Sequence, residues 1–574
     1  MSALPGVTRR VHGVHLVVRA AEDVASFLPA WLMAGAGLAA AVDATALHLG
    51  LLAPLPSLLP IEPDLSGRLV AAAVAAGLFG LAIGLARGKR VAWWLAVAIL
   101  SAALLDQIEL LRHVIPLLLT VVCLVLLIAT RRRYNVVTGA RSRRLAITFW
   151  GAGALLAIAA LGMAIGTALG LVSPATDARD LGSGLLDWLA FGDPGLTVDP
   201  FLRGGLLLIT FAVARVAVVV GVLLALAPGE PPEPSVEGEQ LASSVAERYG
   251  RGALLPFQIG GDAERFTVPG LDAFVAFGLD GRVALILGDP VGPPSQARPA
   301  LLDFAAVCAR NDWLSAAYQA SETGLDTLRE LGYLSYHIGR EAILELDGFD
   351  LSGSRRANLR HTVTRAMRGG ISVEWLPDGL GPNRKGLCKE LLEVDRAWQS
   401  RAGPRLRFTV SSLQSLDQAA SPIALARDAT GRLVAFTSFQ PTGQDSGWVL
   451  DLLRRIPGSI PGAVEACIVE AAAGLGSRGA STLSLGLAPL AGLEVRRGSP
   501  VERILGLGAR LIRRSYDVAG LAFFKGKFDP RWEPRYLVVA RRAHLPAVIL
   551  ALLRLHFGGA RGLIRAGWHS RQAS

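Results

Sequence analysis

The sequence contains few of the residue patterns that mark common metal and disulfide sites. Its four cysteines are scattered and form no CxxC pair, and its nine histidines form no HExxH motif. No histidine pairs with a cysteine at a metal-ligand spacing. Disulfide frameworks and zinc sites depend on such spacings. The sequence therefore predicts no metal site, and we expect buried thiols in a reducing compartment at Cys123, Cys308, Cys388 and Cys467.

Nucleotide-binding and nucleophile motifs are also absent. The chain has no GxxxxGK(S/T) loop, no GxGxxG after a predicted strand, and no glycine-rich loop suited to the pyrophosphate of coenzyme A. It has neither a GxSxG nucleophile elbow nor a Ser-His-Asp set. We therefore expect no cofactor. A transferase that uses an already activated ester needs only positioning, oxyanion stabilisation and a route for one proton.

What the chain does have is apolar length and positive charge. The formal net charge is +11 and the mean hydropathy is +0.43, a combination typical of a membrane protein whose basic surface meets anionic lipid or nucleic acid. Six apolar runs predict membrane helices; most reach the roughly 20 residues that a span needs, and the third is short. The runs are Phe27–Leu52, Leu69–Ala86, Val91–Leu105, Val114–Thr130, Leu145–Val172 and Leu202–Ala227.

The basic residues between these runs predict their orientation. Arginine and lysine follow the second and fourth runs, whereas the segment between the fifth and sixth runs is acidic. The positive-inside rule then places the N-terminus and everything after the sixth run in the cytoplasm, as in a multi-pass protein of the cell membrane. Arg215 lies inside the sixth run, where a charge is a functional candidate. It would pair with Asp43 of the first run or hold a lipid phosphate on a lipid-access route.

Composition divides the chain into four predicted parts. A transmembrane domain of about six helices covers 1–227, a linker rich in proline and glutamate covers 228–240, a cytoplasmic domain covers 241–540, and a basic tail covers 541–574. The linker is too polar to be buried and too rich in proline for a helix. The tail contains no acid, and its apolar run predicts an amphipathic helix on the anionic inner leaflet.

Strands and helices alternate in the cytoplasmic domain. Two hairpin signals, at Asp280–Gly281 and Asp428–Gly431, are each followed by a helix and a further strand. The recurrence of this order indicates a tandem repeat of an α/β unit.

One acid stands out within an apolar strand. Trp448–Leu453 predicts a buried strand that carries Asp451, and a buried charge is costly unless it is paired or used. Arg454 follows three residues later, and Pro457 breaks the strand. At this level the two residues are either an ion pair at a strand end or a pair of catalytic candidates. Positions three apart on an extended strand face opposite sides, so cooperation requires the strand to bend.

Several further residues are candidates for binding substrate. Arg356 and Arg360 flank the apolar stripe of a predicted basic helix at 354–368 and can grip phosphate; a solvated charged helix is the alternative. Asp289 lies in a sharp turn, and turn formation alone also explains it.

Two other groups of candidates lie nearer the C-terminus. Ser484 and Gly486 share one face of a predicted strand at 482–487. Lys525, Lys527 and Arg535 lie beside aromatic residues, a combination that stacks bases or binds phosphate. Similar groups also occur on ordinary domain surfaces.

Taken together, the segments that hold these candidates resemble the phosphatidylglycerol lysyltransferases, the synthase part of the multiple peptide resistance factor family. They follow the family's order and cover most of residues 250–540. The segments are LGDPVGP (287–293), LSGSRRANLRHTVTRA (351–366), VAFTSFQPTG (434–443), LDLLRRIP (450–457), LSLGLAPLAGL (483–493) and FKGKFDPRWEPRYL (524–537).

This resemblance implies a fold and an activity. The fold class would be a membrane bundle of about six helices followed by an α/β domain of two fused acetyltransferase-like (GNAT) units. The enzyme would be an aminoacyltransferase that moves an aminoacyl group, lysine by expectation, from aminoacyl-tRNA to the glycerol hydroxyl of phosphatidylglycerol at the inner leaflet. The product would alter membrane charge and resistance to cationic peptides.

The resemblance also implies roles and partners. Asp451 would orient or deprotonate the lipid hydroxyl, or hold the substrate α-ammonium, and Arg454 would hold the phosphate or the developing oxyanion. The expected partners are aminoacyl-tRNA, phosphatidylglycerol and the membrane, with a homo-oligomer left open.

The sequence departs from the family pattern in two ways. The family often has Lys-Ile-Gly-Glu-Glu-Ala where this chain has His337–Ala342, so the first and fourth positions differ. Six spans suggest a short form without the flippase bundle. Two alternatives remain: an acyl-CoA-dependent GNAT enzyme that acts on a lipid, and a non-catalytic, membrane-anchored binding module.

Overall fold

The chain forms two compact units in a computed structural model. The first comprises Met1–Glu230 with Arg310–Asp312, and the second comprises Pro231–Ala309 with Trp313–Ser574. Within them, the structure describes residues 28–38, 65–110, 114–171, 206–231, 235–260, 262–380, 384–402, 407–413, 416, 421–491 and 518–563.

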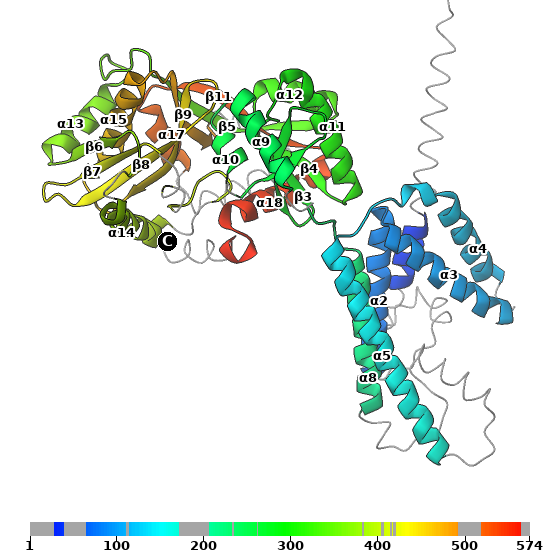
Figure 1. The fold of residues 1–574 in the computed structure, drawn as a ribbon. Coiled ribbons are helices and arrows are strands. Elements are labelled where there is room, and N and C mark those ends of the chain that lie inside the picture. Colours follow the sequence, from blue (N-terminus) through cyan, green and yellow to red (C-terminus); the bar gives the residue numbers. More distant parts are fainter. Residues whose placement is uncertain are drawn as a thin grey trace, which may run out of the picture. The chain divides into compact units, whose positions relative to one another are not determined.

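The described part of the first unit is helical (Figure 1). Neighbouring helices pack as α2 with α3 and α8, α3 with α4, and α5 with α8. Their bounds are α2 Leu65–Ala86, α3 Arg90–Leu110, α4 Val114–Ala129, α5 Ala140–Leu171 and α8 Leu206–Ala225, with a 3-10 turn, η3, at Arg131–Arg133.

The predicted six-span membrane bundle is not shown by this unit. Helices occupy the described parts of the predicted runs, but among the described residues none is both long enough and apolar enough to cross a membrane.

The second unit is built on one sheet of eleven strands (Figure 1). The strand order is β1-β2-β3-β4-β11-β5-β10-β9-β8-β7-β6. The strands are β1 Glu264–Thr267, β2 Phe274–Asp280, β3 Val283–Leu287, β4 Leu314–Ala320, β5 Leu334–Glu345, β6 Ser372–Leu376, β7 Ile423–Arg427, β8 Leu433–Pro441, β9 Gly447–Arg455, β10 Thr482–Pro489 and β11 Arg531–Val539.

Helices cover this sheet on both faces. They are α9 Val236–Tyr249, α10 Leu255–Ile259, α11 Pro294–Arg310, α12 Glu322–Glu330, α13 Ala357–Arg368, α14 Arg384–Ala402, α15 Ala463–Ser477, α17 Val518–Gly526 and α18 Leu545–Phe557, with a 3-10 turn, η5, at Arg542–His544.

The sheet contains the tandem repeat that the order of elements predicted. In the first half the hairpin β2–β3 leads through α11 to β4, which is parallel to β3. In the second half the antiparallel strands β7, β8 and β9 lead through α15 to β10, which is parallel to β9. The halves then exchange their next strands: β5 of the first half pairs with β10, and β11 of the second half pairs with β4. Because β5 and β11 also pair with each other, the two halves form one continuous sheet.

Alternation of apolar side chains along the strands builds the core on both faces. On β2, Phe274 packs with α9, α10 and α18, whereas Val275 packs with α11 and α12. On β7, Leu425 packs with α14, whereas Ala424 packs with α15. The period of two in a strand makes this division possible.

Two predicted boundaries change in the structure. The linker at 228–240 does contain helix, because α9 begins at Val236 and Ser235 caps it by accepting a hydrogen bond from the Gly238 amide. The tail is not a free amphipathic helix either. α18 packs on β2 and β3, and its Leu545 and Val548 are buried in the core, since the sheet offers these side chains an apolar face.

We expect β11 to stabilise both halves of the sheet at once. Leu537 is buried between Tyr318 of β4 and Tyr336 of β5. Leu537→Ala should cost about 2–5 kcal/mol through lost burial and the cavity left behind. Hydrogen exchange on the full chain should show β4 and β10 losing protection together. The matched control is Leu302→Ala on α11, where the side chain is exposed. Loss of protection confined to β4 would contradict this coupling.

Candidate active site

The sheet opens between the parallel strands of its second half. The ladder between β9 and β10 covers Gly447–Val449 and Thr482–Ser484 and ends there. The equivalent ladder of the first half extends along the whole of β3, from Val283 to Leu287. Two irregularities accompany the opening: β9 has an extra residue opposite Ser438, and the register of β10 shifts after Ser484. Beyond this point the two strands form the walls of a cavity.

The cavity has a volume of about 800 Å³ and is lined by both halves of the sheet domain. β9 and β10 form its walls, α10 and α18 contribute apolar side chains, and α13, α15 and α17 meet at its charged part. Charged lining residues are Glu341, Arg365, Asp451, Arg454, Arg455, Glu465, Lys525 and Lys527.

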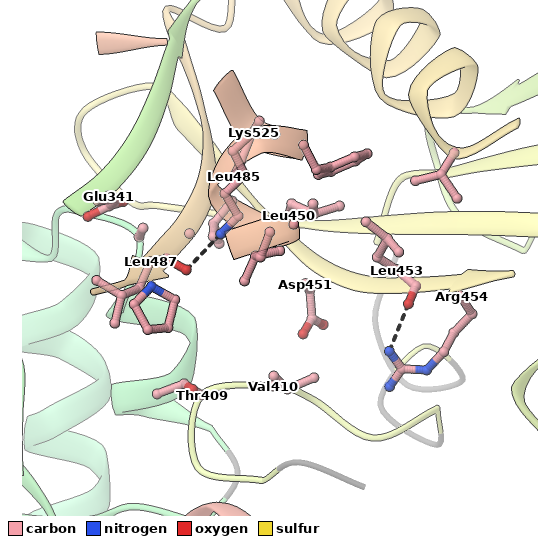
Figure 2. Close-up of a pocket in the computed structure, with 18 of the residues that line it drawn as sticks. Glu341, Thr409, Val410, Leu450, Asp451, Leu453, Arg454, Leu485, Leu487 and Lys525 are labelled. Atoms are coloured by element: carbon pink, nitrogen blue, oxygen red, sulfur yellow. Dashed lines mark hydrogen bonds between the residues drawn. The ribbon is translucent and has the colours of Figure 1, made fainter. Parts of the chain in front are cut away.

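Asp451 points from β9 into the cavity (Figure 2). Its side chain is buried, with 8% of the residue exposed. The Ser411 amide donates a hydrogen bond of 2.9 Å to Oδ1, while Oδ2 has no hydrogen-bond partner among the described residues. Burial raises the pKa of this carboxyl, and the hydrogen bonds from Ser411, the side chain of Gln440 and the charge of Arg454 oppose that change only in part. One carboxylate oxygen is thus left available to a substrate cation or hydroxyl.

Arg454 also lines the cavity, but it is not paired with Asp451. Its Nε donates to Oδ1 of Asp395 on α14 at 2.9 Å, and its Nη1 donates to the carbonyl of Leu453 at 2.9 Å. The extra residue in β9 explains why two positions three apart both reach the cavity: a bulge shifts the alternation of side chains by one. The bend that the sequence required therefore lies at Asp451 and Leu452.

A buried charged cluster lies across the cavity from Asp451. Lys525 is 5% exposed, and its Nζ donates to the carbonyl of Leu487 at 2.8 Å. Burial lowers the pKa of Lys525 to about 7, against the opposing attraction of Glu341. Glu341 is itself buried; it accepts hydrogen bonds from Ser484 and from Arg535, whose Nε lies 2.8 Å from Oε2. Near pH 7 the Lys525 amine therefore exists in both its neutral and its protonated form, which suits it to proton transfer.

Gly486 and Lys527 complete the predicted residues that reach the cavity. Gly486 has φ +78°, which glycine adopts without strain, and its amide donates to Oγ of Ser484 at 3.0 Å. Lys527 pairs with Glu465 of α15 at 2.9 Å.

Other predicted substrate contacts lie outside the cavity. Arg356 and Arg360 donate to carbonyls of the loop before α13, at Asp350 and Leu351 respectively, so their donors stabilise that loop. Asp289 accepts a hydrogen bond from the Ser321 amide at the start of α12. Arg535 acts through Glu341 and is not a lining residue. The Arg215 side chain lies outside the described residues.

The structure also adds residues that the sequence did not single out. Glu341 was passed over because it lies in a segment noted only for its departures from the family pattern. The sequence places Arg365 on the predicted basic helix beyond the apolar stripe, where it can contact RNA backbone or anionic membrane; in the structure it lines the cavity. His556 reaches the cavity from α18, where Oγ1 of Thr409 lies 3.3 Å from its Nε2. No pattern in the sequence of α18 predicts that this helix packs against β2 and β3.

Parallel strands that separate over a cavity, within an antiparallel framework, agree with the expected acetyltransferase-like (GNAT) fold class. The family described as "Phosphatidylglycerol lysyltransferase, C-terminal" matches residues 246–539, and the chain belongs to this family.

Individual relatives agree with this assignment. A phosphatidylglycerol lysyltransferase of Staphylococcus haemolyticus is 25% identical over 342 residues, which cover 59% of this chain and 40% of the relative. A lysylphosphatidylglycerol biosynthesis bifunctional protein of a Mycobacterium species is 27% identical over 512 residues, or 82% of this chain and 45% of the relative. The chain thus matches less than half the length of these relatives.

A solved structure shows the same domain fold. The C-terminal domain of a protein described as a lysylphosphatidylglycerol synthetase, from Agrobacterium fabrum, is 25% identical with a TM-score of 0.50. It covers 57% of this chain and 99% of that chain.

The buried amine of Lys525 should lower the stability of the sheet domain near neutral pH. Its pKa is about 7 in the folded chain and near 10.5 when exposed. Between these values the unfolded chain binds more protons, so the free energy of unfolding should rise with pH, by about 3–5 kcal/mol in total. Below pH 7 the whole free-energy cost of burying the charged Lys525 amine is present. Lys525→Met should remove this slope in urea unfolding between pH 7 and 9.5. Lys389→Met, at an exposed lysine of α14, should retain it; an unchanged slope in Lys525→Met would refute the assignment.

Proposed function

We propose that this chain transfers an aminoacyl group from aminoacyl-tRNA to the glycerol hydroxyl of phosphatidylglycerol, at the inner leaflet of the cell membrane. Lysine is the expected aminoacyl group, because the relatives' names specify lysyl transfer. The observation that carries the proposal is the cavity between β9 and β10, where a free carboxylate oxygen and an amine of pKa about 7 line the same space.

The composition of the cavity suits both substrates. α10, α17 and α18 contribute apolar side chains at Phe257, Phe524 and Leu553, which suit the apolar part of a lipid. Arg454 and Lys527 suit its phosphate, since arginine forms paired hydrogen bonds with phosphate oxygens. A volume of about 800 Å³ accommodates a glycerol headgroup together with an aminoacyl ester.

The proposed reaction is an ester exchange. The lipid hydroxyl oxygen attacks the aminoacyl carbonyl carbon, and the bond from that carbon to the ribose oxygen of the tRNA breaks. Lys525, in its neutral form, takes the proton from the attacking hydroxyl and returns it to the leaving ribose oxygen. Asp451 holds the α-ammonium of the aminoacyl group through Oδ2, and Arg454 binds the lipid phosphate. No covalent enzyme intermediate is needed, because the aminoacyl ester is already activated.

The full chain, incubated with phosphatidylglycerol vesicles and lysyl-tRNA, should form lysyl-phosphatidylglycerol detectable by lipid mass spectrometry. Asp451→Asn should lower kcat/KM about 10- to 100-fold, because it removes a charged hydrogen bond to the ammonium. The control is Asp378→Asn at an exposed acid paired with Arg478, which should keep full activity. Product formed from acyl-CoA in place of the tRNA ester would support the acyl-CoA alternative. No new lipid from a folded chain would support a binding module.

Activity should depend on the ionisation of Lys525. Since the neutral amine is the proposed proton acceptor, kcat/KM should rise about tenfold per pH unit below 7 and become constant above it. Lys525→Arg should lower activity and abolish this inflection, because arginine stays protonated. Asp451→Asn, by contrast, should keep the inflection at reduced activity. If Lys525→Met kept the wild-type pH profile, another group would be the proton acceptor.

A further inference from the structure

The outward face of α13 carries positive charge that the described part of the protein leaves unpaired. Arg365 and Arg368 are exposed and form no ion pair with any described residue. The helix contains no acid along Ala357–Arg368. Arg355, just before the helix, is also exposed and lies 3.8 Å from Asp529. The arginines that do have firm partners, Arg356 and Arg360, stabilise the preceding loop.

This face is continuous with the rim of the cavity. Thr362 and Arg365 of α13 line the cavity directly. The start of α15 packs closely on α13, since a side-chain carbon on Gly462 would lie 2.7 Å from the Thr362 carbonyl. Arg455 adds a further exposed positive charge among the lining residues.

An exposed aromatic ring borders the same rim. Phe523 of α17 is 65% exposed, and Nζ of Lys527 lies 5.6 Å from the centre of its ring. Lys527 lines the cavity, and Asp529, shortly after it, is the residue that Arg355 approaches. A large exposed aromatic among positive charges is the composition of surfaces that bind single-stranded nucleic acid, where bases stack on the ring and phosphates contact the cations.

Charge complementarity favours RNA over a lipid surface as the occupant of this face. Met367 is the exposed large apolar residue of α13, whereas the other exposed positions carry arginine, histidine or small polar side chains. A membrane-binding helix would instead present a continuous apolar face. The apolar lining of the cavity comes mainly from α10, α17 and α18 and from β9 and β10, and not from α13.

We propose that the outward face of α13, with Phe523, docks the single-stranded acceptor end of an RNA. Arg355, Arg365 and Arg368 contact its phosphates, and its terminal base stacks on Phe523. The group esterified to the RNA end then enters the cavity beside Arg365. This inference rests on the proposed function, because that function supplies the reason for an RNA to present an ester here.

The test measures binding by the full chain, without any transfer reaction. The probes are a non-acylated RNA hairpin with a single-stranded CCA end, and vesicles of phosphatidylglycerol and phosphatidylcholine. Arg365→Ala and Arg368→Ala should each weaken RNA binding about fivefold at 0.15 M salt and reduce the salt slope by roughly 0.7–0.9. Phe523→Ala should weaken binding about tenfold with little change in slope. Arg329→Ala, at an exposed arginine of α12, is the matched control and should bind normally.

Each outcome decides the proposal. If the α13 variants are folded by circular dichroism and bind RNA like the wild type, the proposal is wrong. If they lose vesicle binding and keep RNA binding, the face docks a membrane, which also overturns it. Because the RNA carries no aminoacyl group, weakened RNA binding together with no aminoacyl-lipid product would refute the proposed function and leave the docking surface standing. Normal lipid product together with unchanged RNA binding in the variants would refute the docking surface and leave the proposed function standing.

Discussion

The early end of the β9–β10 ladder is the constraint on which the site depends. In a parallel pair, evenly spaced backbone hydrogen bonds hold the two strands side by side along the ladder. Once the ladder stops at Val449 and Ser484, the following residues of both strands are released to form two walls of a cavity. The first half of the sheet shows the alternative, because there β3 and β4 remain paired along the whole of β3. The duplicated unit is therefore open in one copy and closed in the other.

Burial then decides the chemistry of the charged groups in that cavity. Glu341 has Ser484 and Arg535 as partners, so its charge is compensated. Lys525 has a carbonyl as its hydrogen-bond partner and only the nearby charge of Glu341 to offset its desolvation, so its pKa falls to about 7. Asp451 keeps one oxygen without a partner. A buried group without full compensation is costly to the fold and for that reason is a strong indication of function.

The exchange of β5 and β11 ties this site to the whole domain. Ser484 contacts Glu341 of β5, and Glu341 is held by Arg535 of β11, so three strands from both halves meet at one cluster. α18 closes the cavity from the C-terminal end of the chain. The site is consequently assembled from residues 253 to 557, and no local segment contains it.

The sequence by itself determined the alternation of strands and helices, the two hairpins, the family resemblance, and five cavity residues among its candidates: Asp451, Arg454, Gly486, Lys525 and Lys527. These follow from local patterns, because an acid in an apolar strand or a lysine beside aromatics is visible without knowing its neighbours. Four questions depended on contacts that only the folded chain makes. The tertiary structure showed that Arg454 pairs with Asp395, that Arg356 and Arg360 stabilise a loop, and that Glu341 and Arg365 belong to the cavity. It also placed α18 in the core, because burial depends on which surfaces meet, and hydropathy along the chain does not specify that.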